Sequence, residues 1–486
     1  MLRRSRLGWF IAIGIACASC GTDVGFLVPP GDRDAVIANV GQNFESFHDF
    51  TDNDGSAPQT RLLVVPRGEL YGTTTGTSEG DRGTVFRLDS SRTLDVLHDF
   101  NTDDGSAGAA TYAPSALTRL PDGSIVGVTK AGGERLGGAL FRLLDDGSID
   151  ILHHFSGRDG ANPVQAIASD RGTIYGITEV GGSQGAQGTL FAYEGDRLTV
   201  LHRFSDADGI SPTGLVLGED GRLYGTTRAG GQYGLGTMFQ FDFATGLSVL
   251  HAFGGADGAV PVAGLTVAED GSLYGTTARG GANDSGVIFR LLPGSPIEIL
   301  HEFSGEDGST PAAPVTLASD GYLYGTTEFG GRGNSGTIFR LAPTGAFASL
   351  YQFSSRDGAF PRAGLTEARD RWLYGTTSSG GAFGRGTIFR FPLPALPEGD
   401  RATPATTVSP RATPAERETE DAIASPTPAP EARLVPSVAL AAEAALDALD
   451  TGAPENKYDP AALKPVAPQP SELSYLAGSP TLYPLG

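Results

Sequence analysis

Cysteine is nearly absent from this 486-residue chain, in which Cys17 and Cys20 are the two examples. Because both lie near the N-terminus, no disulfide can form within the rest of the sequence. Apolar runs are also short. The run near the N-terminus, Leu7 to Ala16, is too short to span a bilayer, which disfavours a transmembrane anchor there.

Basic residues are outnumbered, with 35 Lys and Arg against 56 Asp and Glu and a formal net charge of −21. A surface of this sign repels phosphates and no basic stripe is present, so nucleic acid is not expected as a partner. Residues with catalytic chemistry recur at repeated positions and do not form one unique constellation. The sequence therefore predicts no catalytic residues, no metal and no cofactor.

The N-terminal segment has the organisation of an export signal. Residues 1–19 combine arginines, the apolar run and small residues, which is typical of a signal peptide of the lipoprotein type. Cys17-Ala18-Ser19-Cys20 resembles a bacterial lipobox, so lipidation of Cys20 is predicted to anchor the exported protein at the outer membrane, facing the cell surface or the periplasm. The alternatives are cleavage before Cys17 and an ordinary signal peptide with an incidental cysteine. Residues 20–43 are interpreted as a linker, and the lipid as the sole contact with the membrane.

Three short motifs recur seven times between residues 44 and 391, with a period of roughly 50 residues. A Tyr-Gly motif occurs at Tyr71, Tyr175, Tyr224, Tyr274, Tyr324 and Tyr374, with Val126-Gly127 in the one gap. A Gly-Thr-x-Phe-Arg motif places its phenylalanine at Phe86, Phe141, Phe191, Phe239, Phe289, Phe339 and Phe389. A Leu-His-x-Phe motif places its phenylalanine at Phe50, Phe100, Phe155, Phe204, Phe253, Phe303 and Phe353.

The fifth copy indicates what one period encodes, because β-rich stretches there alternate with turn sequences. The stretches are 262–268, 273–277, 287–292 and 297–303. Seven such units predict an all-β fold, a seven-bladed β-propeller of four-stranded blades over residues 44–391. The last copy lacks its fourth strand, whereas residues 44–50 supply one before the first copy. The N-terminal strand is therefore predicted to close the last blade and remove an exposed edge.

The combined pattern Leu-Tyr-Gly-Thr-Thr-x-x-Gly-Gly, Gly-Thr-Ile-Phe-Arg and Leu-His-x-Phe-x-x-x-Asp-Gly resembles the GloVer tandem repeat of bacterial exported proteins. The resemblance covers residues 44–391 and implies export and a surface anchor, but no characterised activity. Kelch repeats share the period and the double glycine. Trp372 is the single tryptophan in the repeats, which disfavours kelch.

Beyond the repeats, residues 392–486 are rich in Pro, Ala, Thr and Glu. Such a composition cannot bury a core, so a disordered C-terminal tail is predicted. The Ala- and Leu-rich stretch 437–450 could form one short helix.

All histidines lie in the fourth-strand motif, and equivalent positions on neighbouring blades are at least roughly 10 Å apart, too far to share a zinc ion. We therefore expect structural histidines. The Asp-Gly after each fourth strand is typical of a turn whose carboxylate accepts backbone hydrogen bonds, with calcium binding as the alternative. These residues are Asp54, Asp104, Asp159, Asp208, Asp257, Asp307 and Asp357.

Positions that differ between the copies lie in the long loops between the second and third strands, where propellers present function on a rigid scaffold. The candidate ligand-binding residues are Arg228, Tyr233, Arg279, Asn283, Glu328, Phe329, Arg332 and Phe383. Aromatic, amide and guanidinium groups suit a glycan or a protein partner; the alternative is that they are merely solvated.

Together these patterns favour an exported, lipid-anchored propeller, expected to be a monomer, that acts as a non-catalytic binding or adhesion scaffold at the bacterial cell envelope. One alternative is a structural envelope protein without a discrete ligand. Another is a polysaccharide-acting enzyme with paired carboxylates in the central funnel, which would need two carboxyl groups roughly 5–10 Å apart.

Overall fold

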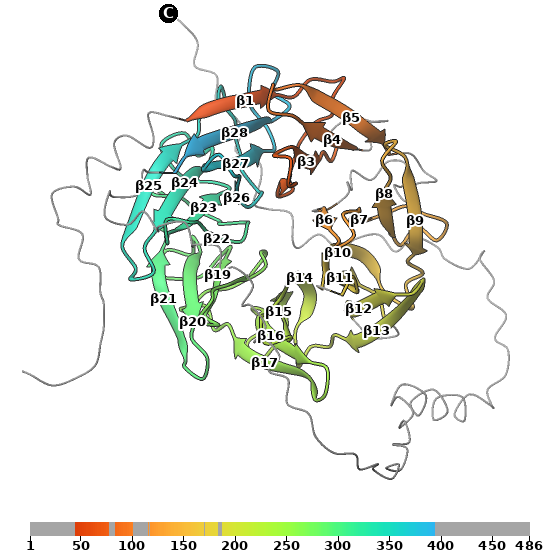
Figure 1. Ribbon diagram of the computed structural model, residues 1–486. Coiled ribbons are helices and arrows are strands. Elements are labelled where there is room, and N and C mark those ends of the chain that lie inside the picture. Colours follow the sequence, from red (N-terminus) through yellow and green to blue (C-terminus); the bar gives the residue numbers. More distant parts are fainter. Residues whose placement is uncertain are drawn as a thin grey trace, which may run out of the picture. The chain divides into compact units, whose positions relative to one another are not determined.

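A computed structural model describes residues 44–76, 83–100, 115, 117–169, 171–182 and 187–393. Seven four-stranded antiparallel sheets form a ring of blades around a central axis (Figure 1). This arrangement confirms the predicted seven-bladed β-propeller. The predicted signal peptide, Cys20, the linker and the tail with its short helix lie outside the described residues. The described part of the chain contains no helix with the length and apolar character needed to cross a membrane.

The blades are numbered in chain order, and each runs from its innermost to its outermost strand. Blade 1 comprises β2 (Leu63–Val64), β3 (Leu70–Thr73), β4 (Thr84–Leu88) and β5 (Leu94–Asp99). Blade 2 comprises β6 (Thr118–Arg119), β7 (Ile125–Thr129), β8 (Ala139–Leu143) and β9 (Ile149–His154). Blade 3 comprises β10 (Ala161–Ala168), β11 (Ile174–Val180), β12 (Thr189–Glu194) and β13 (Arg197–Arg203). Blade 4 comprises β14 (Ile210–Leu217), β15 (Leu223–Ala229), β16 (Thr237–Asp242) and β17 (Gly246–Ala252).

The remaining blades follow the same plan. Blade 5 comprises β18 (Thr266–Val267), β19 (Leu273–Thr277), β20 (Val287–Leu291) and β21 (Ile297–Glu302). Blade 6 comprises β22 (Thr316–Leu317), β23 (Leu323–Thr327), β24 (Thr337–Leu341) and β25 (Phe347–Gln352). Blade 7 comprises β26 (Thr366–Glu367), β27 (Trp372–Thr377), β28 (Thr387–Pro392) and the N-terminal β1 (Glu45–Asp49). The expected first strand at 262–268 is reduced to two residues, because its pairing with β19 covers Thr266 and Val267 alone, and Ala259 forms a separate bridge with Arg279.

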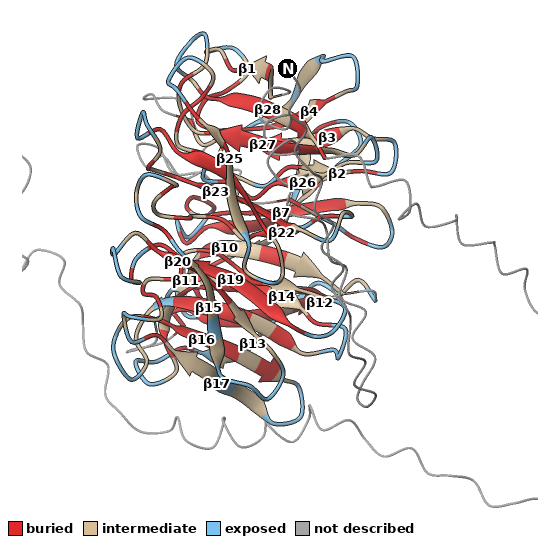
Figure 2. Cartoon of the chain, turned by 90° about the vertical axis from the view of Figure 1, so that its left-hand side faces the viewer, coloured by how far each residue is buried: buried red, intermediate tan, exposed pale blue. Residues whose placement is uncertain are grey.

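The core lies between the blades (Figure 2), and each junction contains one aromatic pair packed among aliphatic side chains. The phenylalanine after each fourth strand packs on the third-strand phenylalanine of the next blade, with ring centroids 5.1–5.5 Å apart. The glycine of each Tyr-Gly motif makes room for the second ring. A Cβ placed on Gly275 would lie 2.4 Å from the Phe289 ring, so a larger residue would overlap it. The three motifs therefore meet in one repeated contact.

Closure of the ring follows the predicted scheme. β1 pairs with β28 from Glu45 opposite Arg390 to Asp49 opposite Thr387. Phe47 and Phe50 are buried, and Phe50 packs on Phe86 of blade 1 as its equivalents do at the other junctions. The two ends of the propeller are therefore joined by backbone pairing and by an aromatic contact.

The fourth-strand histidines fasten the connector between blades. His48, His153, His202, His251 and His301 each lie 2.6–2.9 Å from the aspartate of the following Asp-Gly, and Tyr351 replaces histidine opposite Asp357. The other oxygen of each aspartate accepts a backbone N–H within the connector, as in Ser156 N–H to Asp159 at 2.8 Å. The structure confirms the structural role of these pairs; Asp104, the partner expected for His98, lies outside the described residues.

Candidate functional site

One face of the ring carries both the long loops between second and third strands and the connectors between blades. The second glycine of each Gly-Gly pair fixes this arrangement by donating its N–H to a connector carbonyl, as in Gly231 to Asp206 at 2.7 Å and Gly331 to Gly305 at 2.9 Å. We call this the loop face, and the opposite face, with the tight hairpin turns, the turn face. Arg228 lies at the C-terminal end of the second strand β15, and the other seven candidate residues follow the second strands on the loop face.

Five of the long loops share one tip conformation. In each, the second glycine accepts a hydrogen bond of 3.2–3.3 Å from the residue three positions later. That later residue has a positive φ in every case: Leu136, Gly234, Asp284, Asn334 and Gly384. The residue just before it varies freely on this constant backbone: Arg135, Tyr233, Asn283, Gly333 and Phe383. The side chain at the loop tip thus differs between blades, while the backbone conformation that presents it is the same.

Two of these tips present an aromatic ring to solvent. Tyr233 is 57% exposed and Phe383 62%, on blades 4 and 7 respectively. Tyr233 borders an open groove of about 820 Å³, together with Val249 and His251 on the outer strand β17 and Asp257 on the connector. These tips lie beside the outermost strands and form the outer rim of the loop face.

Arg332 lies in the blade 6 loop one position before Gly333, the equivalent of Tyr233. It is exposed and borders a groove of about 640 Å³ with Tyr351 and Gln352 of the outer strand β25. Its backbone N–H donates to the Gln352 side chain at 3.0 Å, which fixes the loop but leaves the guanidinium outside that contact. Three of the eight candidates, Arg332, Tyr233 and Phe383, therefore belong to the outer rim.

Other candidates lie at the inner end of the second strands, where acids and bases from adjacent blades pair. Glu179 contacts Lys130 at 3.1 Å and Arg228 at 3.9 Å, linking blades 2, 3 and 4. Glu328 is only 8% exposed and accepts two hydrogen bonds from Arg362 of blade 7. Arg228 and Glu328 thus take part in a ring of inter-blade contacts around the channel.

The remaining candidates make contacts within their own loop, with the connector after the fourth strand or with the neighbouring blade. Arg279 forms an ion pair with Asp284 at 3.2 Å, and the Asn283 amide donates to the Phe303 carbonyl at 3.2 Å. Phe329 packs against Phe360, with centroids 5.4 Å apart. The structure does not bring the eight residues into one cluster, because loops of different blades are held apart by the ring.

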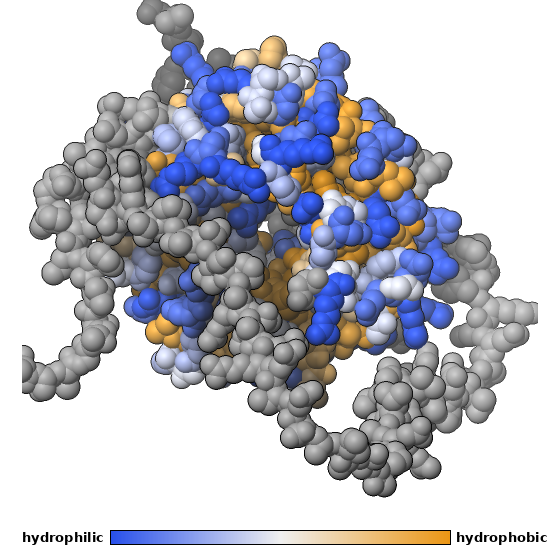
Figure 3. Space-filling view, in the orientation of Figure 1, coloured by the Kyte–Doolittle hydropathy of each residue, from blue (hydrophilic) through white to orange (hydrophobic). Residues whose placement is uncertain are grey.

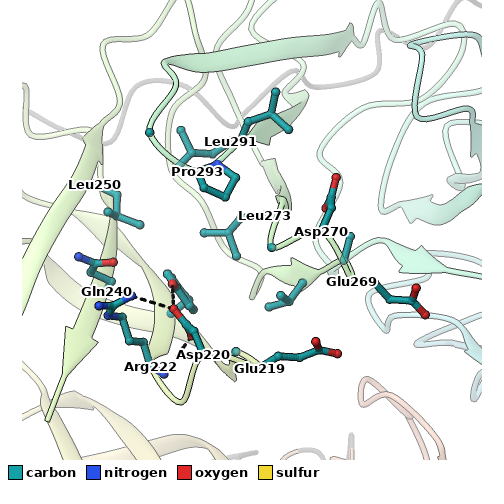
Figure 4. A pocket seen from close by; sticks show the side chains of 17 residues that line it. Glu219, Asp220, Arg222, Gln240, Leu250, Glu269, Asp270, Leu273, Leu291 and Pro293 are labelled. Carbon is teal, nitrogen blue, oxygen red and sulfur yellow. Dashed lines mark hydrogen bonds and ion pairs between the residues drawn. The ribbon is translucent and has the colours of Figure 1, made fainter. Parts of the chain in front are cut away.

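A pocket on the turn face was not anticipated from the sequence. It has a volume of about 440 Å³ and lies between blades 4 and 5 (Figure 4). Figure 4 shows Arg222 linked to Asp220 on one side of the pocket, while Glu219 and Glu269 extend away from them. Burial raises the pKa of Asp220, but hydrogen bonds from Tyr224 and Arg222 outweigh it and lower the pKa overall.

The same tyrosine–aspartate hydrogen bond recurs at Tyr324 with Asp320 and at Tyr374 with Asp370, so this part of the pocket repeats around the ring. The Glu-Asp-Gly turn followed by Leu-Tyr was the sequence signal that could have located it. In the described residues, no three His, Cys, Asp or Glu side chains are grouped so that they could hold a metal ion.

Two Gly-x-Ser-x-Gly sequences, 76–80 and 181–185, occur in the chain between β3 and β4 and between β11 and β12. Their serines, Ser78 and Ser183, lie outside the described residues.

The repeat can now be compared with known families. The profile of the Gloeobacter/Verrucomicrobia repeat matches in three overlapping segments, residues 36–186, 113–316 and 268–405. The chain belongs to this repeat family. The match confirms the resemblance drawn from the motifs. No curated protein matches the chain in sequence.

Solved structures share the propeller fold with this repeat protein at low identity. TolB from Acinetobacter baumannii has 15% identity and a TM-score of 0.37, covering 55% of this chain and 59% of TolB. A gluconolactonase from Xanthomonas campestris has 13% identity and a TM-score of 0.38, covering 57% and 85%. The PQQ-bound aldose sugar dehydrogenase of Streptomyces coelicolor has 14% identity and a TM-score of 0.39, covering 70% and 96%. This chain spans less than two thirds of the TolB structure, and the likenesses concern the fold alone.

Proposed function

We infer that this protein is an exported, lipid-anchored β-propeller that acts as a non-catalytic binding scaffold at the bacterial cell envelope. The observation that carries the inference is the outer rim of the loop face, where Tyr233 and Phe383 project from tips with the same backbone. An exposed large aromatic ring is costly to leave in water and is enriched in binding surfaces. A constant platform with a variable residue at its tip is the organisation expected of a recognition surface.

A glycan is the partner that the blade 4 groove favours. Tyr233 offers a flat apolar ring, and Gln232, His251 and Asp257 offer hydrogen-bonding groups in the same open groove. Sugars present apolar C–H faces and hydroxyl groups together, which matches this combination. The groove is shallow and open to solvent, which suits binding along a chain more than enclosure of a small molecule.

The enzyme alternative needs two carboxyl groups free to act on a glycosidic bond. Near the central channel, Glu179 contacts Lys130, and Glu328 is held by Arg362. Both carboxylates are engaged in contacts with basic side chains, so neither is free to act on a glycosidic bond. These contacts support binding over hydrolysis.

Binding to an immobilised panel of bacterial envelope polysaccharides tests the proposal. The double variant Tyr233→Ala, Phe383→Ala should weaken glycan binding by about tenfold or more, as expected when stacking rings are removed. Phe243→Ala is the matched control, because Phe243 is a 51% exposed aromatic in the turn after β16, on the turn face. Absence of glycan binding, or equal loss in the control, would contradict a glycan site at the outer rim.

The anchor is tested separately by metabolic labelling with a fatty acid in a bacterium that processes lipoproteins. Cys20→Ser should abolish labelling of the protein and release it from the membrane fraction, because Cys20 is the proposed acylation site. Labelling that persists in Cys20→Ser and is lost in Cys17→Ser would place the anchor at the other cysteine.

A further inference from the structure

Arg61 is a long cationic side chain on the wall of the central channel. Figure 3 shows an opening at the centre of the ring. The segment just before each innermost strand borders this axis, and its equivalent position is Gly264, Pro314 and Gly364 in blades 5, 6 and 7. In blade 1 the same position is Arg61. Its side chain reaches across to blade 7, where a Cβ on Gly364 would lie 3.6 Å from Arg61 Cδ.

The described residues provide a hydrogen-bond acceptor for only one of the three nitrogens of the Arg61 guanidinium. Thr366 Oγ1 donates its hydrogen to the Leu62 carbonyl at 2.7 Å and therefore accepts from Arg61 Nε at 3.1 Å. Among the described residues, the Nη1 and Nη2 atoms of Arg61 have no hydrogen-bond acceptor, and no carboxylate lies within 4.0 Å of them. Both terminal nitrogens thus remain available to a ligand.

A second arginine close by has a carboxylate partner, unlike Arg61. Arg362 belongs to the equivalent segment of blade 7 and donates to Gln59, two residues before Arg61. Its charge is balanced by Glu328. The blade 7 cation is therefore neutralised within the protein, whereas the blade 1 cation is not.

The surroundings of Arg61 make an unbalanced charge costly. The side chain is accessible to solvent, yet protein surrounds it on the channel wall, and this desolvation lowers the pKa of its guanidinium. Arginine nevertheless stays protonated at neutral pH. A desolvated cation is stabilised by a counter-charge, and the planar guanidinium fork binds oxyanions through two parallel hydrogen bonds.

We propose that Arg61 is the binding group of an anion site in the central channel, which accepts a small oxyanion, a carboxylate or a phosphate group. The small residues at the equivalent positions leave space beside the guanidinium. On the far side of the ring, Gly214 and Gly264 of blades 4 and 5 approach so closely that a Cβ on Gly214 would lie 2.1 Å from the Gly264 Cα. The site is independent of the outer rim.

Isothermal titration calorimetry of the purified full chain with inorganic phosphate and with malonate tests the proposal at low ionic strength. Wild type should bind at least one of the two probes, and the neutral variant Arg61→Met should weaken that binding by about tenfold or more, the loss expected for a charge-assisted hydrogen bond. Arg61→Lys keeps the charge but not the fork, so an intermediate loss is expected. A preference for phosphate or for malonate distinguishes the two sources of the oxyanion.

Arg279→Met is the matched control, because Arg279 is an exposed arginine that already pairs with Asp284 on the loop face. It should leave anion binding unchanged, as should the Tyr233→Ala, Phe383→Ala variant. Failure of the wild type to bind either probe at millimolar concentration would overturn the proposal. The proposal would also be overturned if the wild type, Arg61→Lys and Arg61→Met bound the probe with equal affinity. A loss of affinity in Arg279→Met as large as that in Arg61→Met would overturn it as well. If Arg61→Met fails to fold, the Arg61→Lys comparison decides alone.

Discussion

Replacement of Phe50 by alanine measures how firmly the N-terminal strand closes the ring. Phe50 is fully buried, and its ring lies 5.3 Å from that of Phe86 in blade 1. Removing a buried phenylalanine side chain costs about 3–5 kcal/mol. The unfolding entropy is about 2.1 cal/mol/K per residue, or about 0.7 kcal/mol/K for roughly 350 residues of propeller, so a loss of about 4 kcal/mol lowers Tm by about 5 °C.

Phe303→Ala provides the internal reference for this measurement. Phe303 has the same burial and the same contact, 5.4 Å from Phe339, but lies at a junction where the chain is continuous from blade to blade. If β1 is a full member of blade 7, the two variants should lose similar stability in differential scanning calorimetry. A Phe50→Ala melting temperature within about 1 °C of wild type, beside a clear loss for Phe303→Ala, would refute closure by β1.

Two further predictions follow from the repeated contacts. Burial raises the pKa of Asp159, but hydrogen bonds led by that from His153 lower it to about 2. The ionised carboxylate therefore stabilises the fold by about 2 kcal/mol. This stabilisation is present above pH about 4 and is lost as the pH falls toward 2. Asp159→Asn should therefore show a smaller drop in urea midpoint between pH 4.5 and 2.5 than wild type, and an unchanged drop would contradict the assignment. Gly275→Ala should lower the free energy of unfolding by about 1–3 kcal/mol, since its Cβ would overlap the ring of Phe289. Gly254→Ala is the control, because its Cβ would meet only ordinary contacts at 3.6 Å, and it should be nearly neutral in the same urea titration. Equal effects of the two variants would count against the ring contact.

The sequence by itself determined the fold in considerable detail. The number of blades, the order of strands and the closure by residues 44–50 could be predicted because each blade repeats the same local pattern. Phe303, His301 and Gly275 recur with fixed spacing, and the contacts that they make, ring on ring and imidazole to Asp307, also recur. A contact that is made seven times leaves a periodic trace that one sequence is enough to reveal.

Only the tertiary structure decided which candidate side chains are free. Glu328 and Arg362 are 34 residues apart, and Arg61 and Thr366 are 305 apart, so no local spacing signals that they meet. The expected first strand of blade 5 pairs with β19 through Thr266 and Val267 alone, which the apolar pattern did not reveal. Residues that occur in one blade alone have no periodicity, and their partners come from the neighbouring blade. The ring geometry therefore places Tyr233 at the outer rim and Arg61 in the channel, whereas the sequence marked Tyr233 merely as a variable loop position and did not single out Arg61.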